Sequence, residues 1–251
     1  MSEIRAPDRN RAILAPPGTR LYAVGDVHGR LDLLNRLLAA ILRDAASSRA
    51  PRRVIVFLGD YVDRGPDSRR VIETLRQGPP KTPQWSGFRW IALRGNHEES
   101  LLRFLDDIEI GPMWLANGGY PTIQDYVGEP TPPPDDLAAL QEALRRALPL
   151  EHAAFLSALP TWHAEGDYYF VHAGIRPGVP LDRQSPDDLL WIRRPFLVSS
   201  ADHGKLVVHG HTISPIPEVR PNRIGIDTGA YVTGHLTALV AEGAGCRFLT
   251  T

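Results

Sequence analysis

Acidic, amide and imidazole side chains recur in this sequence directly after apolar stretches, in short segments rich in glycine. Asp26 and His28 lie two residues apart in GDVHG, and Asp60 follows the apolar run VIVFL after one glycine. Later apolar runs are followed by four further residues of these types: Asn96, His97, His172 and His211. Imidazole and carboxylate together suit a borderline divalent metal such as Zn, Mn or Fe. The set is too large for one four-coordinate ion, so the sequence predicts two metal ions that share one carboxylate.

Each of these residues also has a purely structural interpretation. An aspartate after a strand is commonly a helix cap or a turn residue. A single histidine there is commonly a hydrogen-bonded polar residue, and Arg64 in GDYVDRG could equally form a surface ion pair. Such interpretations must hold independently at five separate places in the chain, whereas one metal site explains all five. The sequence therefore favours metal binding.

Alternating strands and helices are expected to position these residues. Apolar runs at 20–24, 53–58 and 88–93 predict strands, and the three-and-four spacing of apolar residues predicts a helix after each, over 31–45, 67–77 and 98–107. This repeated pattern indicates a parallel α/β core. Open α/β sheets bind ligands at the carboxyl ends of their strands, so the polar segments should converge there.

The rest of the chain is expected to complete the same domain. Residues 106–160 are mostly helical in pattern and contain a proline-rich linker, GEPTPPPDD; we interpret them as a helical insertion into a single domain spanning 1–251. Residues 1–19 resemble an irregular lead-in. Further strands are expected within 167–175, 205–212, 221–230 and 236–250, and the last of these segments should be a hairpin that turns at 242–245.

The composition excludes several classes of protein. A net charge of −1 and a pI near 6.8 give no basic surface for nucleic acid or for an anionic membrane. The start of the chain lacks the apolar core of a signal peptide, and no run approaches the ~18 apolar residues of a membrane span. The one cysteine, Cys246, excludes an internal disulfide. We therefore expect a cytoplasmic protein with no membrane and no nucleic-acid partner.

Five motifs in this order, GDVHG, GDYVDRG, RGNHEE, VHAG and HGHT, resemble the phosphoprotein phosphatase branch of the calcineurin-like metallophosphoesterases. The resemblance covers roughly residues 20–240 and is closest to the bacterial serine/threonine protein phosphatases, which share GDYVDRGPDS, WLANGG, LLWIR and IDTGA. Many other metallophosphoesterases resemble one another in carrying GNHD and G-H-x-H. Here the motif is GNHE, and Ile213 stands two residues after His211, so both points favour this branch.

The resemblance implies a fold and a set of metal ligands. The fold would be α/β, a β-sandwich of two mixed sheets flanked by helices, with a dinuclear metal site at the carboxyl ends of the strands. Asp26 and His28 would hold the first ion, and Asp60 would bridge both ions. The second ion would have three further ligands: Asn96, His172 and His211. The two divalent ions would be manganese in the first instance, with Fe, Zn or Co as alternatives.

The resemblance also implies catalytic roles. His97 would protonate the leaving group, and Asp63 would orient His97 by a hydrogen bond. Arg64 would bind the phosphate, helped by a second arginine, for which Arg193 is favoured over its neighbour Arg194. A hydroxide generated by the two metals would attack phosphorus in line, without a covalent intermediate.

These roles leave more than one substrate open. The favoured function is a serine/threonine protein phosphatase acting on a phosphoprotein or phosphopeptide. The alternative is a pyrophosphohydrolase for dinucleoside polyphosphates, similar to the symmetrical diadenosine tetraphosphatases, which share nearly all the metal motifs. A noncatalytic protein on a retired enzyme fold fits poorly, because every expected ligand is present.

Overall fold

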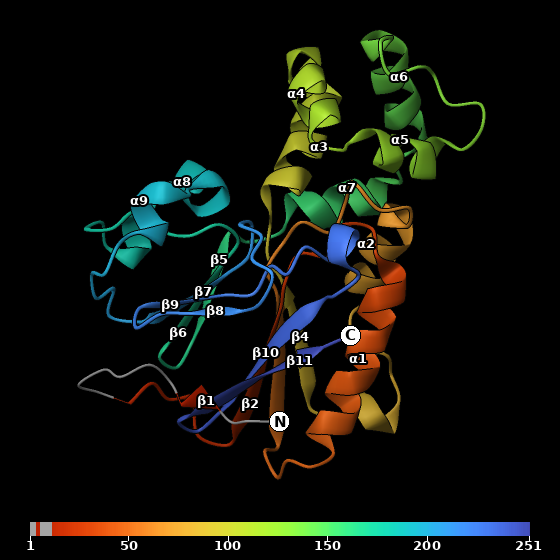
Figure 1. Ribbon diagram of the computed structural model, residues 1–251. Coiled ribbons are helices and arrows are strands. Elements are labelled where there is room, and N and C mark those ends of the chain that lie inside the picture. Colours follow the sequence, from red (N-terminus) through yellow and green to blue (C-terminus); the bar gives the residue numbers. More distant parts are fainter. Residues whose placement is uncertain (1–3, 6–11) are drawn as a thin grey trace.

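The computed structural model describes residues 4–5 and 12–251, which form two β-sheets with helices on their outer sides (Figure 1). The larger sheet has the strand order β1-β11-β10-β2-β3-β4, and the smaller has the order β5-β6-β7-β9-β8. Strands β2, β3 and β4 are parallel to one another, as are β6, β7 and β9, while the remaining pairs are antiparallel. Both sheets are therefore mixed, as expected.

The strands of the larger sheet are β1 Ile4–Arg5, β2 Thr19–Val24, β3 Arg52–Phe57, β4 Phe88–Ala92, β10 Thr237–Glu242 and β11 Gly245–Thr250. Those of the smaller sheet are β5 Trp162–Glu165, β6 Tyr168–Val171, β7 Leu206–His209, β8 Glu218–Val219 and β9 Arg223–Gly225. The predicted terminal hairpin is confirmed, since Glu242 pairs with Gly245. The expected irregular lead-in is wrong at Ile4–Arg5, which pair with β11, and its residues 1–3 and 6–11 lie outside the described chain.

The helices are α1 Leu31–Ala45, α2 Ser68–Gln77, α3 Asn96–Asp106, α4 Gly111–Ala116, α5 Tyr120–Val127, α6 Leu137–Ala147, α7 Leu150–Ser157, α8 Pro186–Trp191, α9 Arg194–Leu197 and α10 Ala230–Thr233. Three short 3-10 turns lie at Pro83–Trp85 (η1), Ile108–Ile110 (η2) and Leu181–Arg183 (η3). Helices α4 to α6 stand beyond the end of the larger sheet (Figure 1). Within the described residues, no helix has the length and apolar character that crossing a membrane requires.

The core follows from the alternation of side chains along the strands. In β2, Leu21 and Ala23 belong to the apolar cluster that also contains Tyr168 and Val208, so this cluster fills the space between the two sheets. Tyr22 and its partners on the adjacent strands, Ile55 and Val240, face the other way, into a cluster with the apolar side of α1. A third cluster lies between the smaller sheet and helices α8 and α9. The two sheets are thus fixed face to face, and their strand ends come together.

Helix α3 begins at Asn96, two residues before the predicted start. The reason is a capping interaction: Glu98, the third helical residue, accepts a hydrogen bond of 2.8 Å from the backbone N–H of Gly95. Asn96 and His97 therefore belong to the first helical turn rather than to a loop. A helix fixes the directions of both side chains more firmly than a turn would.

Candidate metal centre and phosphate pocket

Four loops and one helix end bring the predicted metal ligands to the same place. The loops follow β2, β3, β6 and β7, and the helix end is the first turn of α3. All six side chains are buried there: Asp26, His28, Asp60, Asn96, His172 and His211. All of them except His172 line a pocket of about 150 Å³, whose lining consists of Asp26, His28, Asp60, Arg64, Asn96, His97, Asn117, Trp191, Arg193 and His211. The expected convergence at the carboxyl ends of the strands is what the structure shows.

The loops after β2 and β3 cross in direct contact. A Cβ atom on Gly65 would lie 2.1 Å from the carbonyl oxygen of His28, so no larger residue fits. The backbone is also strained here: all five non-glycine residues with positive φ among the described residues are predicted site residues, namely His28, Asp60, Asp63, Arg64 and His211. Such conformations persist only where the surroundings enforce them, and they gather at functional sites.

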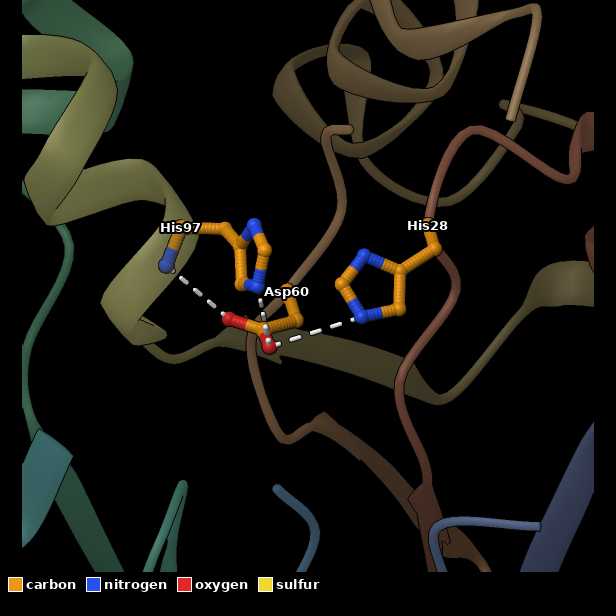
Figure 2. A group of neighbouring side chains, drawn as sticks. All are labelled: His28, Asp60 and His97. Carbon is orange, nitrogen blue, oxygen red and sulfur yellow. Dashed lines mark hydrogen bonds and ion pairs between the residues drawn. The ribbon is translucent and has the colours of Figure 1, made fainter. Parts of the chain in front are cut away.

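Asp60 lies at the centre of the site (Figure 2). Its Oδ2 atom is 3.6 Å from His28 Nε2 and 3.8 Å from His97 Nε2, while its Oδ1 atom is 3.4 Å from His172 Nε2. Burial opposes ionisation of Asp60, but the surrounding histidines outweigh burial and hold its pKa below the usual value. Two potential metal-binding groups share this carboxylate, one with His28 and His97 and the other with His172 and His211.

Backbone carbonyl groups fix the orientation of two histidine rings. His28 Nδ1 donates to Val62 O at 2.8 Å, and His172 Nδ1 donates to Leu58 O at 3.0 Å. Burial lowers the pKa of both imidazoles, that of His28 to about 3, so the rings are neutral. Each ring therefore presents an unprotonated Nε2 to the site, which is the arrangement that a metal ligand requires.

Several hydrogen-bond acceptor atoms lie close together with no proton between them, and a bound cation would stabilise this arrangement. His172 Nε2 lies 2.7 Å from Asn96 Oδ1 and 3.4 Å from Asp60 Oδ1. Asp26 Oδ1 and His211 Nε2 are buried and have no hydrogen-bond partner. Burial, with the nearby charges of Asp227 and Asp60, also raises the pKa of Asp26 well above its usual value. Buried polar atoms rarely lack a partner, so these oxygen and nitrogen atoms suit the role of ligands to divalent metal ions.

His97 is held by Asp63 at the edge of the pocket. The Asp63 Oδ2 atom lies 2.6 Å from His97 Nδ1 and also accepts a 2.7 Å hydrogen bond from Trp114 Nε1. The other oxygen, Oδ1, accepts from Thr122 Oγ1 at 2.7 Å. Burial lowers the pKa of His97, but Asp60 and Asp63 outweigh it and raise the value to about 9. His97 is therefore cationic near neutral pH, and its ring is fixed by its carboxylate partner.

Arg64 spans the two histidines at the mouth of the pocket. Its Nη1 lies 3.1 Å from His28 Nε2, and its Nη2 lies 3.3 Å from His97 Nε2. A proton on His97 Nε2 excludes a hydrogen bond from Arg64 to that atom, so protonated His97 leaves Arg64 bonded to His28. The guanidinium carbon of Arg64 lies 4.5 Å from the centre of the Tyr231 ring. The sequence alone assigned no role to Tyr231. This contact between cation and aromatic ring steadies the arginine.

Three further lining residues come from segments outside the ligand loops. Arg193 lines the pocket and donates from Nη1 to Thr212 Oγ1 at 3.2 Å, whereas Arg194 is not among the lining residues. Trp191, the last residue of α8, also lines the pocket, and Asn117, which follows α4, lies beside Arg64, since its backbone oxygen accepts a 3.2 Å hydrogen bond from Arg64 Nε. Trp114 packs on Phe104 and also donates a hydrogen bond to Asp63, whereas Trp191 borders the pocket.

Glu98 supports the site from behind and was not predicted as a site residue. Its carboxylate accepts backbone hydrogen bonds from Asp60 at 2.8 Å, from Tyr61 at 2.7 Å and from Gly95 at 2.8 Å. Burial and the charge of Asp60 raise its pKa to about 7, although the backbone donors oppose this shift. In the sequence, this supporting role could have been inferred from Glu98, the last residue of GNHE. By contrast, His209 is buried against Gly210 and Arg223 and does not line the pocket.

Comparison with known proteins establishes the class. Residues 19–236 match the family of calcineurin-like phosphoesterases, so the chain belongs to this family. Over 86% of its length it is 33% identical to serine/threonine-protein phosphatase 2 of Escherichia coli, covering 90% of that protein. It is also 36% identical to the asymmetrical bis(5'-nucleosyl)-tetraphosphatase PrpE of Oceanobacillus iheyensis, over 87% of each chain. The expected family is confirmed.

More distant matches agree with this class. A symmetrical bis(5'-nucleosyl)-tetraphosphatase of Dechloromonas aromatica is 30% identical over 62% of this chain, and the match spans only 44% of that enzyme. Among solved structures, a protein serine/threonine phosphatase from Saccharomyces cerevisiae is similar with a TM-score of 0.56 at 16% identity, covering 94% of this chain and 80% of the other. At this identity the likeness shows the fold alone, and the predicted fold class is confirmed.

Proposed function

We propose that this chain is a metal-dependent phosphomonoesterase that dephosphorylates phosphoserine and phosphothreonine in proteins. The pair formed by Asp63 and His97 supports this proposal most directly. A serine alkoxide is a poor leaving group and needs a proton donor, and His97 is a cationic imidazole at the pocket edge. A nucleotide leaving group is a much weaker base and has less need of such a donor.

The proposed metal ligands are those that the sequence suggested. Asp26 and His28 would hold one divalent ion, and Asp60 would contact both ions. The other ion would have three further ligands: Asn96, His172 and His211. When bound, a pair of ions such as Mn²⁺, Fe, Zn²⁺ or Co²⁺ lowers the pKa of water and so supplies a nucleophile near neutral pH.

The chain's own residues would bind the substrate and manage the proton. Arg64 and Arg193 both line the pocket, so their guanidinium groups would donate hydrogen bonds to the phosphate oxygens. His97 would donate the Nε2 proton to the departing oxygen, while Asp63 holds Nδ1. Among the residues that the structure describes, no serine, threonine or cysteine lines the pocket, which fits direct hydrolysis without a covalent intermediate.

We also propose that residues 1–251 act as one domain with a helical insertion at 106–160. Two residues of this insertion, Trp114 and Thr122, hydrogen-bond the Asp63 carboxylate. The insertion would therefore be part of the catalytic apparatus rather than a surface addition.

Hydrolysis of dinucleoside polyphosphates is the second candidate. Trp191 lines the pocket with 38% of its surface exposed, so a nucleobase could stack on it. Several relatives are named for this activity. A parallel assay with manganese decides between the candidates: we expect a phosphoserine peptide to be hydrolysed with a higher kcat/KM than diadenosine tetraphosphate. The reverse order would overturn the proposal in favour of the second candidate.

A further inference from the structure

A second cavity lies at the opposite end of the larger sheet from the catalytic pocket. It has a volume of about 550 Å³ and is bordered by the last turn of α1, the start of β3, the turn η1 and the start of β4. It shares no lining residue with the catalytic pocket. Binding sites for small molecules commonly have volumes of ~300–1,000 Å³. The cavity is therefore large enough for a small organic ligand.

The wall of this cavity is mostly hydrocarbon. Its apolar residues are Leu42, Ala45, Ala46, Pro51, Pro83 and Phe88. The Phe88 ring is fixed from behind, because its centre lies 4.9 Å from that of Trp85, which in turn lies 5.3 Å from Trp90. Gln84 and Ser86 add a few polar atoms at the border. Such a surface suits the flat apolar body of a ligand.

Two arginines border the same cavity without carboxylate partners among the described residues. Arg53 lies with its guanidinium carbon 5.7 Å from the centre of the Phe88 ring. It donates one long hydrogen bond, 3.5 Å, to Ser86 O, and its Nε is buried without an acceptor. Arg43, in the last turn of α1, is exposed at the border. The positive charge beside the apolar wall is thus not neutralised within residues 12–251.

We propose that this cavity is a binding site for an organic anion, in which a carboxylate, sulfonate or phosphate group is carried on a flat apolar body. The acidic group would pair with the guanidinium groups of Arg53 and Arg43, whose planar forks donate hydrogen bonds to two oxygens at once. The apolar body would pack against Phe88 and Pro83. The site is independent of the catalytic reaction and of its substrate.

The position of the cavity gives the ligand contact with two strands that lead to the metal loops. Arg53 and Phe88 are directly paired residues in the parallel β3–β4 ladder. Strand β3 continues toward Asp60, and β4 continues toward Asn96. A ligand that touches both residues therefore contacts the amino ends of the strands whose carboxyl ends precede the catalytic site.

The probe for this site is 8-anilinonaphthalene-1-sulfonate, a flat aromatic anion whose fluorescence rises in apolar surroundings. We expect saturable binding of one equivalent, measured by fluorescence and by calorimetry. The uncharged analogue N-phenyl-1-naphthylamine should bind at least tenfold more weakly, because it cannot pair with the arginines. In hydrogen–deuterium exchange of the unmodified chain, the sulfonate should protect residues 42–53 and 83–90.

Substitutions test whether the probe binds in this cavity. Arg53→Gln should weaken sulfonate binding at least tenfold and leave the uncharged analogue unaffected, and Ala46→Trp should fill the cavity and weaken both. Arg89→Gln is the matched control, because Arg89 is exposed on β4 but does not line the cavity. Melting curves establish that the variants fold, and the exchange experiment needs no variant. Absence of saturable binding, equal affinity in Arg53→Gln, or protection confined to other segments would each overturn the proposal.

Discussion

Arg64 Nη1 lies 3.1 Å from His28 Nε2, and it donates its proton to the lone pair that a metal ion would use. The other ring nitrogen of His28, Nδ1, cannot bind the ion instead, because it donates a hydrogen bond to the carbonyl oxygen of Val62. Arg64, the proposed phosphate-binding residue, and the proposed first metal ion would thus compete for one nitrogen atom. Metal binding should release the guanidinium, which then becomes available to the substrate.

This competition predicts an effect on metal affinity. Arg64→Met should tighten binding of Mn²⁺ at the first site by about fivefold, since one net hydrogen bond contributes ~1 kcal/mol. The same variant should lose affinity for inorganic phosphate. Titration calorimetry with Mn²⁺ measures the first effect, and phosphate inhibition measures the second. Arg194→Met, at an exposed arginine outside the pocket, is the control; weaker metal binding in Arg64→Met would contradict the competition.

If His97 is the general acid, the loss of activity on replacing it should depend on the leaving group of the substrate. His97→Asn should lower kcat for a phosphoserine peptide by ~10²–10⁴-fold, which is the usual contribution of a general acid. With p-nitrophenyl phosphate, whose leaving group is stable as an anion, the loss should be less than tenfold. Steady-state kinetics on both substrates gives the comparison, with His235→Asn as a surface control. Equal losses on the two substrates would show that His97 is not the acid.

The role of Trp114 predicts a smaller effect of the same kind. Trp114→Phe keeps the ring packed on Phe104 but removes the hydrogen bond to Asp63 Oδ2. We expect kcat for the phosphoserine peptide to fall by about tenfold, while kcat for p-nitrophenyl phosphate stays within a factor of two. Trp162→Phe, far from Asp63 in β5, controls for loss of an indole. If Trp114→Phe is unchanged on both substrates, the indole donor does not position the acid.

Glu98 predicts a cost to stability. Glu98→Gln replaces one accepting oxygen with an amide that faces backbone N–H groups, so the free energy of unfolding should fall by about 2 kcal/mol. Urea unfolding at pH 8 in the presence of a chelator measures this value without a contribution from metal. Glu99→Gln is a matched control, because the neighbouring Glu99 is partly exposed and pairs with Arg94; its loss should be below ~1 kcal/mol. Equal losses in the two variants would contradict the supporting role of Glu98.

Metal removal should also lower stability. A ligand at 100 times its Kd stabilises the folded state by ~2.7 kcal/mol, so Mn²⁺ should raise the melting temperature by several degrees over the chelated protein. Asp60→Asn should abolish most of this rise, because both potential metal-binding groups contain Asp60. Asp136→Asn, at the cap of α6, should keep it. An unchanged melting temperature on adding Mn²⁺ to the wild type would argue against the proposed metal centre.

Much of the architecture and the local clustering of the site followed from short-range patterns. Asp26 and Asp60 each follow a parallel strand of the larger sheet, and parallel strands bring such residues to one edge. His172 follows β6 of the smaller sheet, so its approach to them depends on the packing of the two sheets. Glycines that permit the loop crossing were equally visible. The preference for Arg193 over Arg194 came from the resemblance alone, and the structure places only Arg193 at the pocket.

Other contacts depend on packing between segments far apart in the chain. Trp114 and Thr122 reach Asp63 across separations of 51 and 59 residues, and no local pattern indicates which helix face turns toward the loop. The short strands β1 and β8, with two residues each, carry no periodicity that could be recognised. The start of α3 was misplaced because the Gly95 cap comes from a side chain that lies within the helix itself.

The close crossing of the loops at His28 and Gly65 limits where the pocket can accept substitutions. At the crossing the two backbones touch and leave no volume for a larger side chain, so Gly65 cannot be replaced there. Asn117 is tied to the same crossing, because its backbone oxygen accepts a 3.2 Å hydrogen bond from Arg64 Nε. Trp191 and Arg193 are exposed pocket residues at the end of α8 and just after it, so libraries for altered selectivity belong at these two positions.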